Sequence, residues 1–379
     1  MEVATESRWE FVRLTIEMDE RDLKDLKLPI SERLAVNACA TVTARRALCK
    51  TVGRAQCAAA LAEKLPDAEV TCHFLDLYPA EDSMELTRSL PNVNVICSPD
   101  LPREEIDLFV LPVSRGGEAE LTRDWLQQGY DLLVDGGQLI ATVDNPKDVW
   151  LHHEIEKLGK NLDRTPKRHG VVYRLKKIKA LKRRRDFSCQ FAFRDGETLV
   201  QAVTRPGVFS HRRLDLGARV LIEAMDVREG DSVLDIGCGS GAVGLAAALR
   251  VPGVRVHCID SNARAVQCAE VGAQLNEIAT LTTGLTADGD LTVTDPQTRE
   301  THDLTGTFDL AAGNPPYFSH HQIAEIFLQT ARRGLRPGGR VLMVTKHAEW
   351  LVARMEQLFD EVTPAEARGY TVVSGIQRS

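Results

Sequence analysis

The chain has 379 residues, of which 43% are hydrophobic and 27% charged, so it is neither disordered nor fibrous and exceeds what one compact core usually holds. Its formal net charge of −7 argues against a general affinity for polyanions. No run of 18 apolar residues indicates a membrane span, and the first 30 residues mix acids with bases where a signal peptide would be apolar. We therefore expect a cytoplasmic protein of two domains.

The nine cysteines form no Cys-x-x-Cys pair, so neither a disulfide framework nor a structural zinc site is expected. They are interpreted as small apolar packing residues in a reducing compartment. Two pairs of adjacent histidines, His152-His153 and His320-His321, lack the spacing of a metal motif, because neighbouring side chains point in different directions. The sequence predicts no bound metal.

The pattern of the first half of the chain returns in the second half. Each half has a Pro-containing turn before a β-rich run, a short apolar strand, a Gly-Gly turn before a buried-type strand, an amphipathic helix with a tryptophan, and a closing strand. Strands separated by helix-length segments predict βαβ units and a mainly parallel sheet, so we expect two tandem copies of one α/β plan. The matching segments are 65–76 and 251–260, 107–114 and 309–316, 134–144 and 336–346, 148–159 and 348–359, and 169–177 and 370–378.

A basic stretch separates the two copies. Residues 174–185 hold eight bases and no acid. We place the domain boundary in this stretch, which gives domains 1–183 and 184–379. The bases indicate a local contact with a phosphate backbone, although a solvated linker or helix face explains them equally well. The candidate RNA contacts are Lys182, Arg183, Arg184 and Arg185.

A glycine-rich turn begins the sheet of the second copy. Residues 232–241 read SVLDIGCGSG, in which a buried-type strand carries Asp235 near its end and a helix follows the last glycine. Glycines let the backbone turn sharply and approach a ligand without Cβ clashes. A second strand ends about 20 residues later at Asp260, whose carboxylate can accept hydrogen bonds from ribose hydroxyls. Dinucleotide-binding enzymes and purely structural turns share this pattern. A carboxylate at Asp235 would not help to bind the pyrophosphate of a dinucleotide, but it would help to bind a cofactor that carries an ammonium and a sulfonium group.

A second motif follows a short apolar strand in residues 308–318, FDLAAGNPPYF. The carboxyl end of such a strand is where α/β sheets bind ligands. An exocyclic base amine is a poor nucleophile because its lone pair is delocalised into the ring. The Asn314 side-chain oxygen and the Pro315 carbonyl can hold the amine hydrogens and direct the lone pair, while Pro316 stiffens the turn. Tyr317 can stack on a flipped base. A simple Pro-Pro turn is the alternative interpretation.

Both motifs resemble those of one enzyme class. VLDIGCGSG followed by Asp260 is similar to motif I and the ribose acid of class I S-adenosylmethionine-dependent methyltransferases. Asn-Pro-Pro-Tyr resembles the motif of members that methylate adenine N6, guanine N2 or a glutamine amide; cytosine C5 enzymes use a Cys normally preceded by Pro, and no Pro-Cys pair occurs here. The resemblance implies two Rossmann-like domains with mainly parallel seven-stranded sheets flanked by helices. It implies S-adenosylmethionine as the cofactor, bound by Asp235, Gly237, Cys238, Gly239, Gly241, Asp260, Ser261, Asp288 and Asn314. Asp288 lies in the polar stretch from Thr282 to Thr305, which we predict to be a long loop between strands.

Residues 205–225, RPGVFSHRRLDLGARVLIEAM, narrow this resemblance. They match a segment typical of ribosomal RNA guanine-N2 methyltransferases, which also carry two tandem domains of which only the C-terminal one binds cofactor. The likeness implies that Phe209 borders the cofactor or the target base; a core Phe that anchors the loop is the alternative. Those enzymes usually have Phe and His after Asn-Pro-Pro, whereas Tyr317, Phe318 and Ser319 follow here, which leaves the exact base open.

The first copy has lost the motif residues. Aligning residues 47–55 with 233–241 places Cys49 at Asp235 and leaves Gly53 as the one matching glycine, and Pro112 falls at Asn314. Asp76 is interpreted as a retained counterpart of Asp260. We therefore expect the N-terminal domain to serve scaffolding or RNA docking rather than chemistry.

The sequence thus predicts methylation of an exocyclic base amine, guanine N2 in the first place, with ribosomal RNA or a ribosomal subunit as partner. Adenine N6 and a protein glutamine are the alternatives among enzymes, and the duplicated layout does not resemble the smaller helical N-terminal domain of glutamine enzymes. A non-catalytic RNA-binding or assembly factor is the alternative of another class, and the intact Asp235, Asp260 and Asn314 argue against it. The predicted catalytic residues are Asn314, Pro315, Pro316 and Tyr317.

Overall fold

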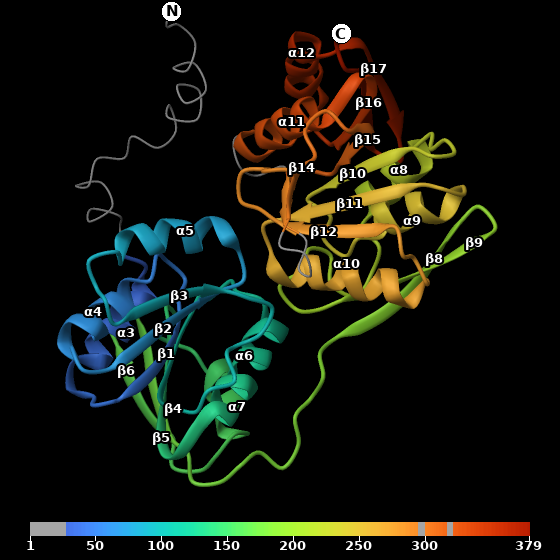
Figure 1. Ribbon diagram of the computed structural model, residues 1–379. Helices are drawn as coiled ribbons and strands as arrows, with labels where there is room; N and C mark the ends of the chain where they lie inside the picture. Colours follow the sequence, from blue (N-terminus) through green and yellow to red (C-terminus); the bar gives the residue numbers. More distant parts are fainter. Residues whose placement is uncertain (1–27, 295–299, 317–320) are drawn as a thin grey trace, which may run out of the picture.

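The computed structural model describes residues 28–294, 300–316 and 321–379, which form two α/β units (Figure 1). Each unit contains a seven-stranded sheet, and corresponding strands take the same order in both. Five neighbouring strands of each sheet pair in parallel, and the last two pairings at one edge are antiparallel, so that only the sixth strand in the order runs against the others. The prediction of two tandem Rossmann-like domains is confirmed.

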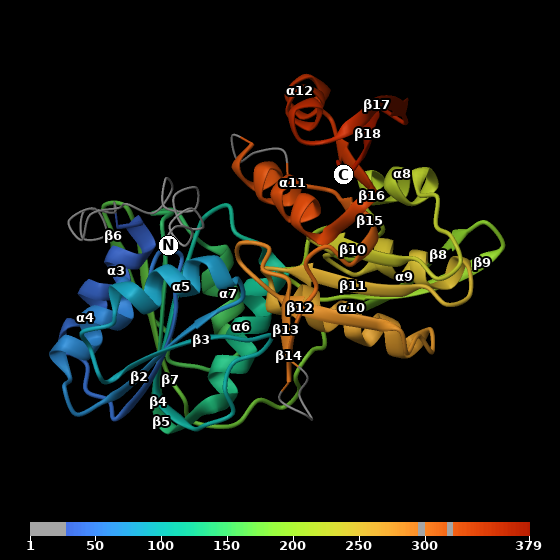
Figure 2. The same ribbon diagram turned by 45° about the horizontal axis from the view of Figure 1, so that its top comes forward.

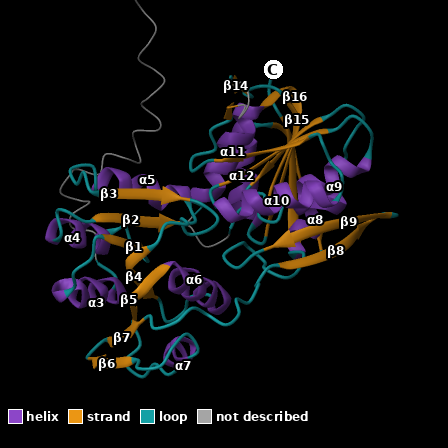
Figure 3. Ribbon diagram, turned by 60° about the horizontal axis from the view of Figure 1, so that its bottom comes forward, coloured by secondary structure: helices purple, strands orange, loops and turns teal. Residues whose placement is uncertain are grey.

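The N-terminal sheet has the strand order β3-β2-β1-β4-β5-β7-β6. Helices cover both faces, with α3 and α4 on one side and α6 and α7 on the other (Figure 3). The strands are β1 (Arg46–Lys50), β2 (Glu69–Phe74), β3 (Val93–Cys97), β4 (Ile106–Val113), β5 (Leu133–Val143), β6 (Asp163–Lys167) and β7 (Gly170–Lys176). The helices are α3 (Ile30–Ala38), the 3₁₀ turn η1 (Cys39–Thr41), α4 (Gln56–Lys64), α5 (Leu77–Leu86), α6 (Ala119–Leu132) and α7 (Trp150–Glu156).

The C-terminal sheet has the order β12-β11-β10-β15-β16-β18-β17. Its strands are β10 (Ser232–Ile236), β11 (Arg255–Asp260), β12 (Leu281–Leu285), β15 (Phe308–Gly313), β16 (Leu335–Thr345), β17 (Asp360–Ala367) and β18 (Tyr370–Ile376). Its helices are α8 (Leu216–Ala224), α9 (Ala242–Arg250), α10 (Ala263–Leu275), α11 (Gln322–Gly334) and α12 (Ala348–Leu358). An antiparallel ribbon, β8 (Cys189–Asp195) and β9 (Thr198–Thr204), precedes the sheet.

The prediction that residues 282–305 form one long loop is wrong. Most of β12 lies within them, and the short antiparallel strands β13 (Thr292–Thr294) and β14 (Thr301–Asp303) pair further along. The abundant Thr residues suit strands, whose pleated backbone accommodates a β-branched side chain. The segment is polar because β12 is the edge strand of its sheet and β13 and β14 form a separate two-stranded sheet.

The basic stretch is divided between two environments. Arg174 belongs to β7, and the Lys177 ammonium donates hydrogen bonds to the carbonyls of Asp131 and Leu133. Residues 182–185 are exposed in the connection between β7 and β8, where the Arg184 guanidinium lies 3.2 Å from the Asp131 carboxylate. The proposed boundary between residues 183 and 184 falls in this connection and stays a prediction.

The two units lie side by side and meet through equivalent loops (Figure 2). The Leu77 N–H donates to the Ser261 carbonyl and the Ala263 N–H donates to the Leu75 carbonyl, both at 2.8 Å. Between these bonds Asp76 and Asn262 form an antiparallel bridge. These residues begin α5 and α10, the first helices after the second strand of each sheet, so the interface has a local two-fold pseudosymmetry.

All nine cysteines lie within the described residues and are free thiols, seven of them buried. This agrees with their interpretation as packing residues. Among the helices that the structure describes, none has the length and apolar character needed to cross a membrane.

Candidate active site

The glycine turn and the Asn314 amide lie side by side at the carboxyl edge of the C-terminal sheet. Strands β10 and β15 pair in parallel, and their last residues, Ile236 and Gly313, lie opposite each other. Gly237 directly follows β10, and Asn314 directly follows β15. Neighbouring strands are about 4.8 Å apart, so the two motifs emerge next to each other. The Phe327 ring of α11 packs beneath both, since it would lie within 2.8 Å of a Cβ on either Gly237 or Gly313.

The three glycines of the turn all have positive φ, at 66°, 55° and 74° for Gly237, Gly239 and Gly241. Two of them are also required by packing. A Cβ on Gly237 would meet the Phe327 ring, and a Cβ on Gly241 would lie 2.8 Å from the Ala269 Cβ. A Cβ on Gly239 would have nothing within 4 Å. The middle of the turn therefore faces open space with its backbone bare, which fits a ligand placed against it.

Asp235 is buried, with 2% of its surface exposed. Its Oδ2 atom accepts a hydrogen bond of 2.9 Å from the N–H of Gly244, in the first turn of α9. Burial raises the pKa of this carboxyl to about 7. The side chain thus holds the helix that follows the glycine turn. Cys238 is also buried, and the thiol of Cys258 faces its own, so Cys238 can offer a ligand only its backbone.

Asp260 ends β11 and links the glycine turn to the next loop. One carboxyl oxygen accepts from the N–H of Gly239 and the other from the N–H of Asn262, both at 2.9 Å. Burial raises the pKa of Asp260 to about 6, and the negative charge of Asp76 in the N-terminal unit also raises it. Ser261, the next residue, is the one whose carbonyl accepts from the Leu77 N–H. The N-terminal unit therefore supports this edge of the site directly.

The Asn314 side chain is oriented by a residue that the sequence assigned no role. Its Nδ2 atom donates a hydrogen bond of 2.9 Å to Asp215 Oδ2, and the same oxygen accepts from the Ala218 N–H as the N-cap of α8. A carboxylate can only accept hydrogen bonds, so the Asn314 NH₂ group must face Asp215. The Asn314 Oδ1 atom is then the atom that can accept a hydrogen bond from a substrate. The sequence signal for Asp215 was an Asp before an amphipathic helix, which also reads as an ordinary cap.

The remaining candidates take different positions. Pro315 is buried and Pro316 half-buried, while Tyr317 lies outside the described residues. Phe209 is 63% exposed in the loop between β9 and α8, so the alternative that it anchors the core is wrong. Asp288 lies in an exposed turn after β12, where its Oδ1 atom accepts from the Asp290 N–H at 3.0 Å. Burial and the charge of Asp288 both raise the pKa of Glu81 in α5, so α5 of the N-terminal unit lies near this turn.

The N-terminal unit keeps the shape of the turn without its chemistry. Ala55 begins α4 with φ of 62°, as Gly241 begins α9 at 74°. The buried carboxylate of Glu32 fills the turn from within, because it accepts from the N–H groups of Val52 and Cys57 and from the Thr51 hydroxyl. Burial raises the pKa of Glu32, because removing the carboxylate from water is unfavourable.

The strand registers also show which residues replace the site. Cys49 pairs with Cys72 and Val110 as Asp235 pairs with Cys258 and Ala312, so Cys49 and Pro112 stand at the positions of Asp235 and Asn314. Pro29 precedes α3 where Asp215 precedes α8. The interpretation of Asp76 as the counterpart of Asp260 is wrong: the register places Phe74 there, and Asp76 corresponds to Asn262 at the start of the next helix. The unit has therefore lost the ribose acid as well.

Comparisons with known proteins agree with this geometry. Residues 200–374 match the family model of the methyltransferase small domain. The chain is 25% identical over 302 residues to a ribosomal RNA small subunit methyltransferase C of Pseudoalteromonas translucida, covering 76% of this chain and 81% of that protein. It is 32% identical to the protein of the same description from Pseudomonas aeruginosa and 30% identical to a ribosomal RNA large subunit methyltransferase G of Shewanella oneidensis. These two alignments cover 40% and 45% of this chain, and 42% and 44% of the relatives.

A solved structure shares the two-unit fold. The T. thermophilus 16S rRNA N2 G1207 methyltransferase, in complex with AdoMet and guanosine, superposes with a TM-score of 0.71 and 21% identity, covering 91% of both chains. The family match lies on the unit that holds the glycine turn and Asn314, and the similarity of fold extends over the degenerate unit as well. The second unit thus matches the methyltransferase small domain, and over both units the chain is similar to proteins named as ribosomal RNA methyltransferases.

Proposed function

We propose that this chain transfers a methyl group from S-adenosylmethionine to the exocyclic N2 of a guanine in ribosomal RNA. The observation that carries the proposal is the pair of motifs on adjacent strand ends: a glycine turn with open space above it, and an Asn amide fixed by Asp215. The relatives named as ribosomal RNA methyltransferases support the substrate class.

The residues that would hold the cofactor surround the glycine turn. We propose that the bare backbone at Gly239 lies against it, that the Asp260 carboxylate accepts hydrogen bonds from its ribose, and that Asp288 contacts its adenine. Asp235 acts beneath the turn, where it fixes the first turn of α9. When bound, S-adenosylmethionine supplies a methyl group on a positively charged sulfur, already a good leaving group.

The protein's part of the reaction is then to position the amine. Asn314 Oδ1 and the Pro315 carbonyl accept the two hydrogens of the guanine amine, which localises the nitrogen lone pair and directs it toward the methyl group. Asp215 holds Asn314 in the orientation that makes this possible, since it binds the Nδ2 atom. We propose that Phe209, which is exposed, contacts the flipped base and that Tyr317 stacks on it, where stacking contributes about 1–3 kcal/mol.

The nine free cysteines suit a reducing compartment, which supports the proposal that the enzyme acts in the cytoplasm. The exposed bases Lys182, Arg183, Arg184 and Arg185 are proposed as contacts for the RNA backbone.

The test is the Asn314→Ala variant, assayed by transfer of a labelled methyl group to unmethylated ribosomal RNA and followed by nucleoside mass spectrometry. The wild-type protein is expected to yield N2-methylguanosine. Loss of the amide acceptor should reduce kcat by roughly 10²–10³ while the dissociation constant of the cofactor stays the same. An unchanged kcat would remove the proposed role of Asn314, and a product methylated on adenine N6 would replace guanine as the substrate.

A further inference from the structure

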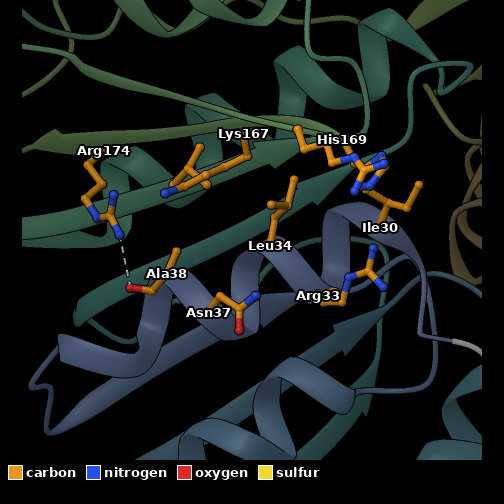
Figure 4. Close-up of a pocket in the computed structure, with 10 residues that line it drawn as sticks. Ile30, Arg33, Leu34, Asn37, Ala38, Lys167, His169 and Arg174 are labelled. Carbon is orange, nitrogen blue, oxygen red and sulfur yellow. Dashed lines mark hydrogen bonds between the residues drawn. The ribbon is translucent and has the colours of Figure 1, made fainter.

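A cavity of about 320 Å³ lies in the N-terminal unit, away from the candidate active site (Figure 4). It is enclosed by α3 on one side and by the β6–β7 hairpin on the other. Its floor is apolar and includes Leu34 and Val172, and Leu34 points from α3 toward the hairpin. The residues around it are Ile30, Arg33, Leu34, Asn37, Ala38, Lys167, Arg168, His169, Val172 and Arg174.

The rim of the cavity is cationic. It carries four Lys or Arg side chains and a histidine, and no carboxylate, in a chain whose formal net charge is −7. The Arg174 guanidinium is held, because it donates to the Ala38 carbonyl at 3.3 Å and lies 3.9 Å from Asp163. Arg33, Lys167 and Arg168 are exposed and form no ion pair with any residue that the structure describes. Unpaired cations gathered at one place favour an anionic ligand.

The duplicated unit offers an internal comparison. Helices α3 and α8 have equal length and precede β1 and β10 by the same spacing, so Asn37 corresponds to Glu223. The hairpin turns also correspond, since Lys167 pairs with Gly170 as Ala367 pairs with Tyr370. In the C-terminal unit, the Arg368 guanidinium of this turn binds the Glu223 carboxylate at 3.0 and 3.1 Å.

In the N-terminal unit the same place has lost the acid and gained bases. Asn37 replaces Glu223, so Arg168 has no carboxylate in the position that neutralises Arg368. Lys167 and His169 replace Ala367 and Gly369. Folding requires none of these changes, because the C-terminal copy has the same hairpin and helix without them. The excess positive charge therefore indicates a ligand.

We propose that this cavity binds the sugar–phosphate backbone of the substrate RNA, with Arg33, Lys167 and Arg168 contacting phosphates and the apolar floor accepting an unstacked nucleotide. The proposal rests on the ribosomal RNA substrate proposed above. An apolar floor with a basic rim suits a nucleotide better than a free phosphate, which would leave the floor without a partner. The site anchors RNA on the unit that has no cofactor motif, and so gives that unit a function.

The experiment compares two double variants that change the net charge equally. Lys167→Glu with Arg168→Glu alters the cavity, whereas Arg103→Glu with Lys160→Glu alters exposed bases elsewhere on the same unit. For unmodified, transcribed small-subunit ribosomal RNA, the cavity variant should show a KM raised roughly tenfold or more relative to the control pair, and a slope of log K against log salt reduced by roughly one to two. The kcat at saturating RNA and the cofactor dissociation constant should match those of the control.

A single substitution provides a milder test. Asn37→Glu restores the carboxylate that binds the turn arginine in the C-terminal unit, so it should raise the KM for RNA, whereas Asn37→Gln should not. Equal RNA affinity in the cavity variant and the control variant would overturn the proposal. If the cavity variant also changed the oligomeric state of the protein, the cavity would be assigned to contact with a second copy of the chain instead. Failure of the wild-type protein to bind or methylate RNA would instead contradict the proposed function.

Discussion

At the scale of single residues, the site depends on a hydrogen bond between two side chains that are 99 positions apart in the chain. Asn314 alone could present either its oxygen or its NH₂ group to a substrate. The Asp215 carboxylate removes this ambiguity because it accepts from Nδ2. Proline stands at both equivalent positions of the N-terminal unit, 112 and 29, so that unit has neither member of the pair.

Asp215→Ser should therefore separate orientation from stability. Serine caps a helix about as well as aspartate, so α8 should remain intact, but its short side chain cannot be expected to reach the Asn314 amide. We expect kcat to fall by roughly tenfold to a hundredfold, because a small misplacement of a positioning group has such an effect. Cofactor affinity and thermal unfolding should stay near the wild-type values. A kcat equal to that of the wild type would show that Asn314 keeps its orientation without Asp215.

At the scale of elements, the sequence predicted the two sheets and both motifs because each depends on local patterns. Strand ends, the glycine turn and Asn-Pro-Pro-Tyr are contiguous in the chain. The assignment of Asp76 failed because it used the last acid of a run, whereas the register of β2 against β1 fixes Phe74 as the counterpart of Asp260. The role of Asp215 and the exposure of Phe209 depend on contacts between distant segments, which no local pattern contains.

The edge formed by β10 and β11 should make cofactor binding pH-dependent. Burial raises the pKa of Asp260 to about 6 and that of Asp235 to about 7, from an ordinary 3.8. The folded protein therefore binds these protons more tightly than the unfolded chain, and the two groups favour folding less as the pH rises from about 4 to about 7. Ribose hydroxyls bind the ionised form of Asp260, so the cofactor dissociation constant should decrease as the pH rises through about 6. Calorimetric titrations between pH 5 and 8 would measure this.

The N-terminal unit contributes to this pH dependence. The charge of Asp76 raises the pKa of Asp260 across the interface, so Asp76→Asn should lower it and move the midpoint of the binding curve to lower pH. Asp67→Asn, on an exposed turn of the same unit, is the control and should leave the midpoint unchanged. A midpoint that does not move in Asp76→Asn, or affinity that is independent of pH in the wild type, would contradict the assignment of Asp260.

At the scale of the whole molecule, one buried arginine joins the two units. Arg264 begins α10 of the C-terminal unit and has no exposed surface. Its guanidinium donates to the Pro99 and Pro206 carbonyls and to the Asp124 carboxylate, at 2.6, 2.7 and 2.6 Å. It also lies 4.3 Å from the centre of the Trp125 ring, and the Lys50 ammonium lies at the same distance from that ring. The loop beside it carries Ser261, so the arginine connects the docking of the units to the cofactor edge.

Arg264→Met should therefore weaken both stability and cofactor binding. The variant removes the positive charge beside the buried Asp124 carboxylate, to which only the Gln128 amide would still donate, and the donor to two carbonyls. Removing one partner of a buried pair costs about 3–5 kcal/mol. Thermal unfolding should occur at a lower temperature, and cofactor affinity should fall because the Leu75–Leu77 loop no longer holds the Ser261 carbonyl in place. Arg88→Met, which removes an exposed arginine, is the control. The combined Arg264→Met and Asp124→Asn variant should recover part of the stability, since it removes the unpaired charge. Additive losses would show that Arg264 and Asp124 do not stabilise each other. An unfolding temperature equal to that of the control would show that the other contacts between the units hold them together without Arg264.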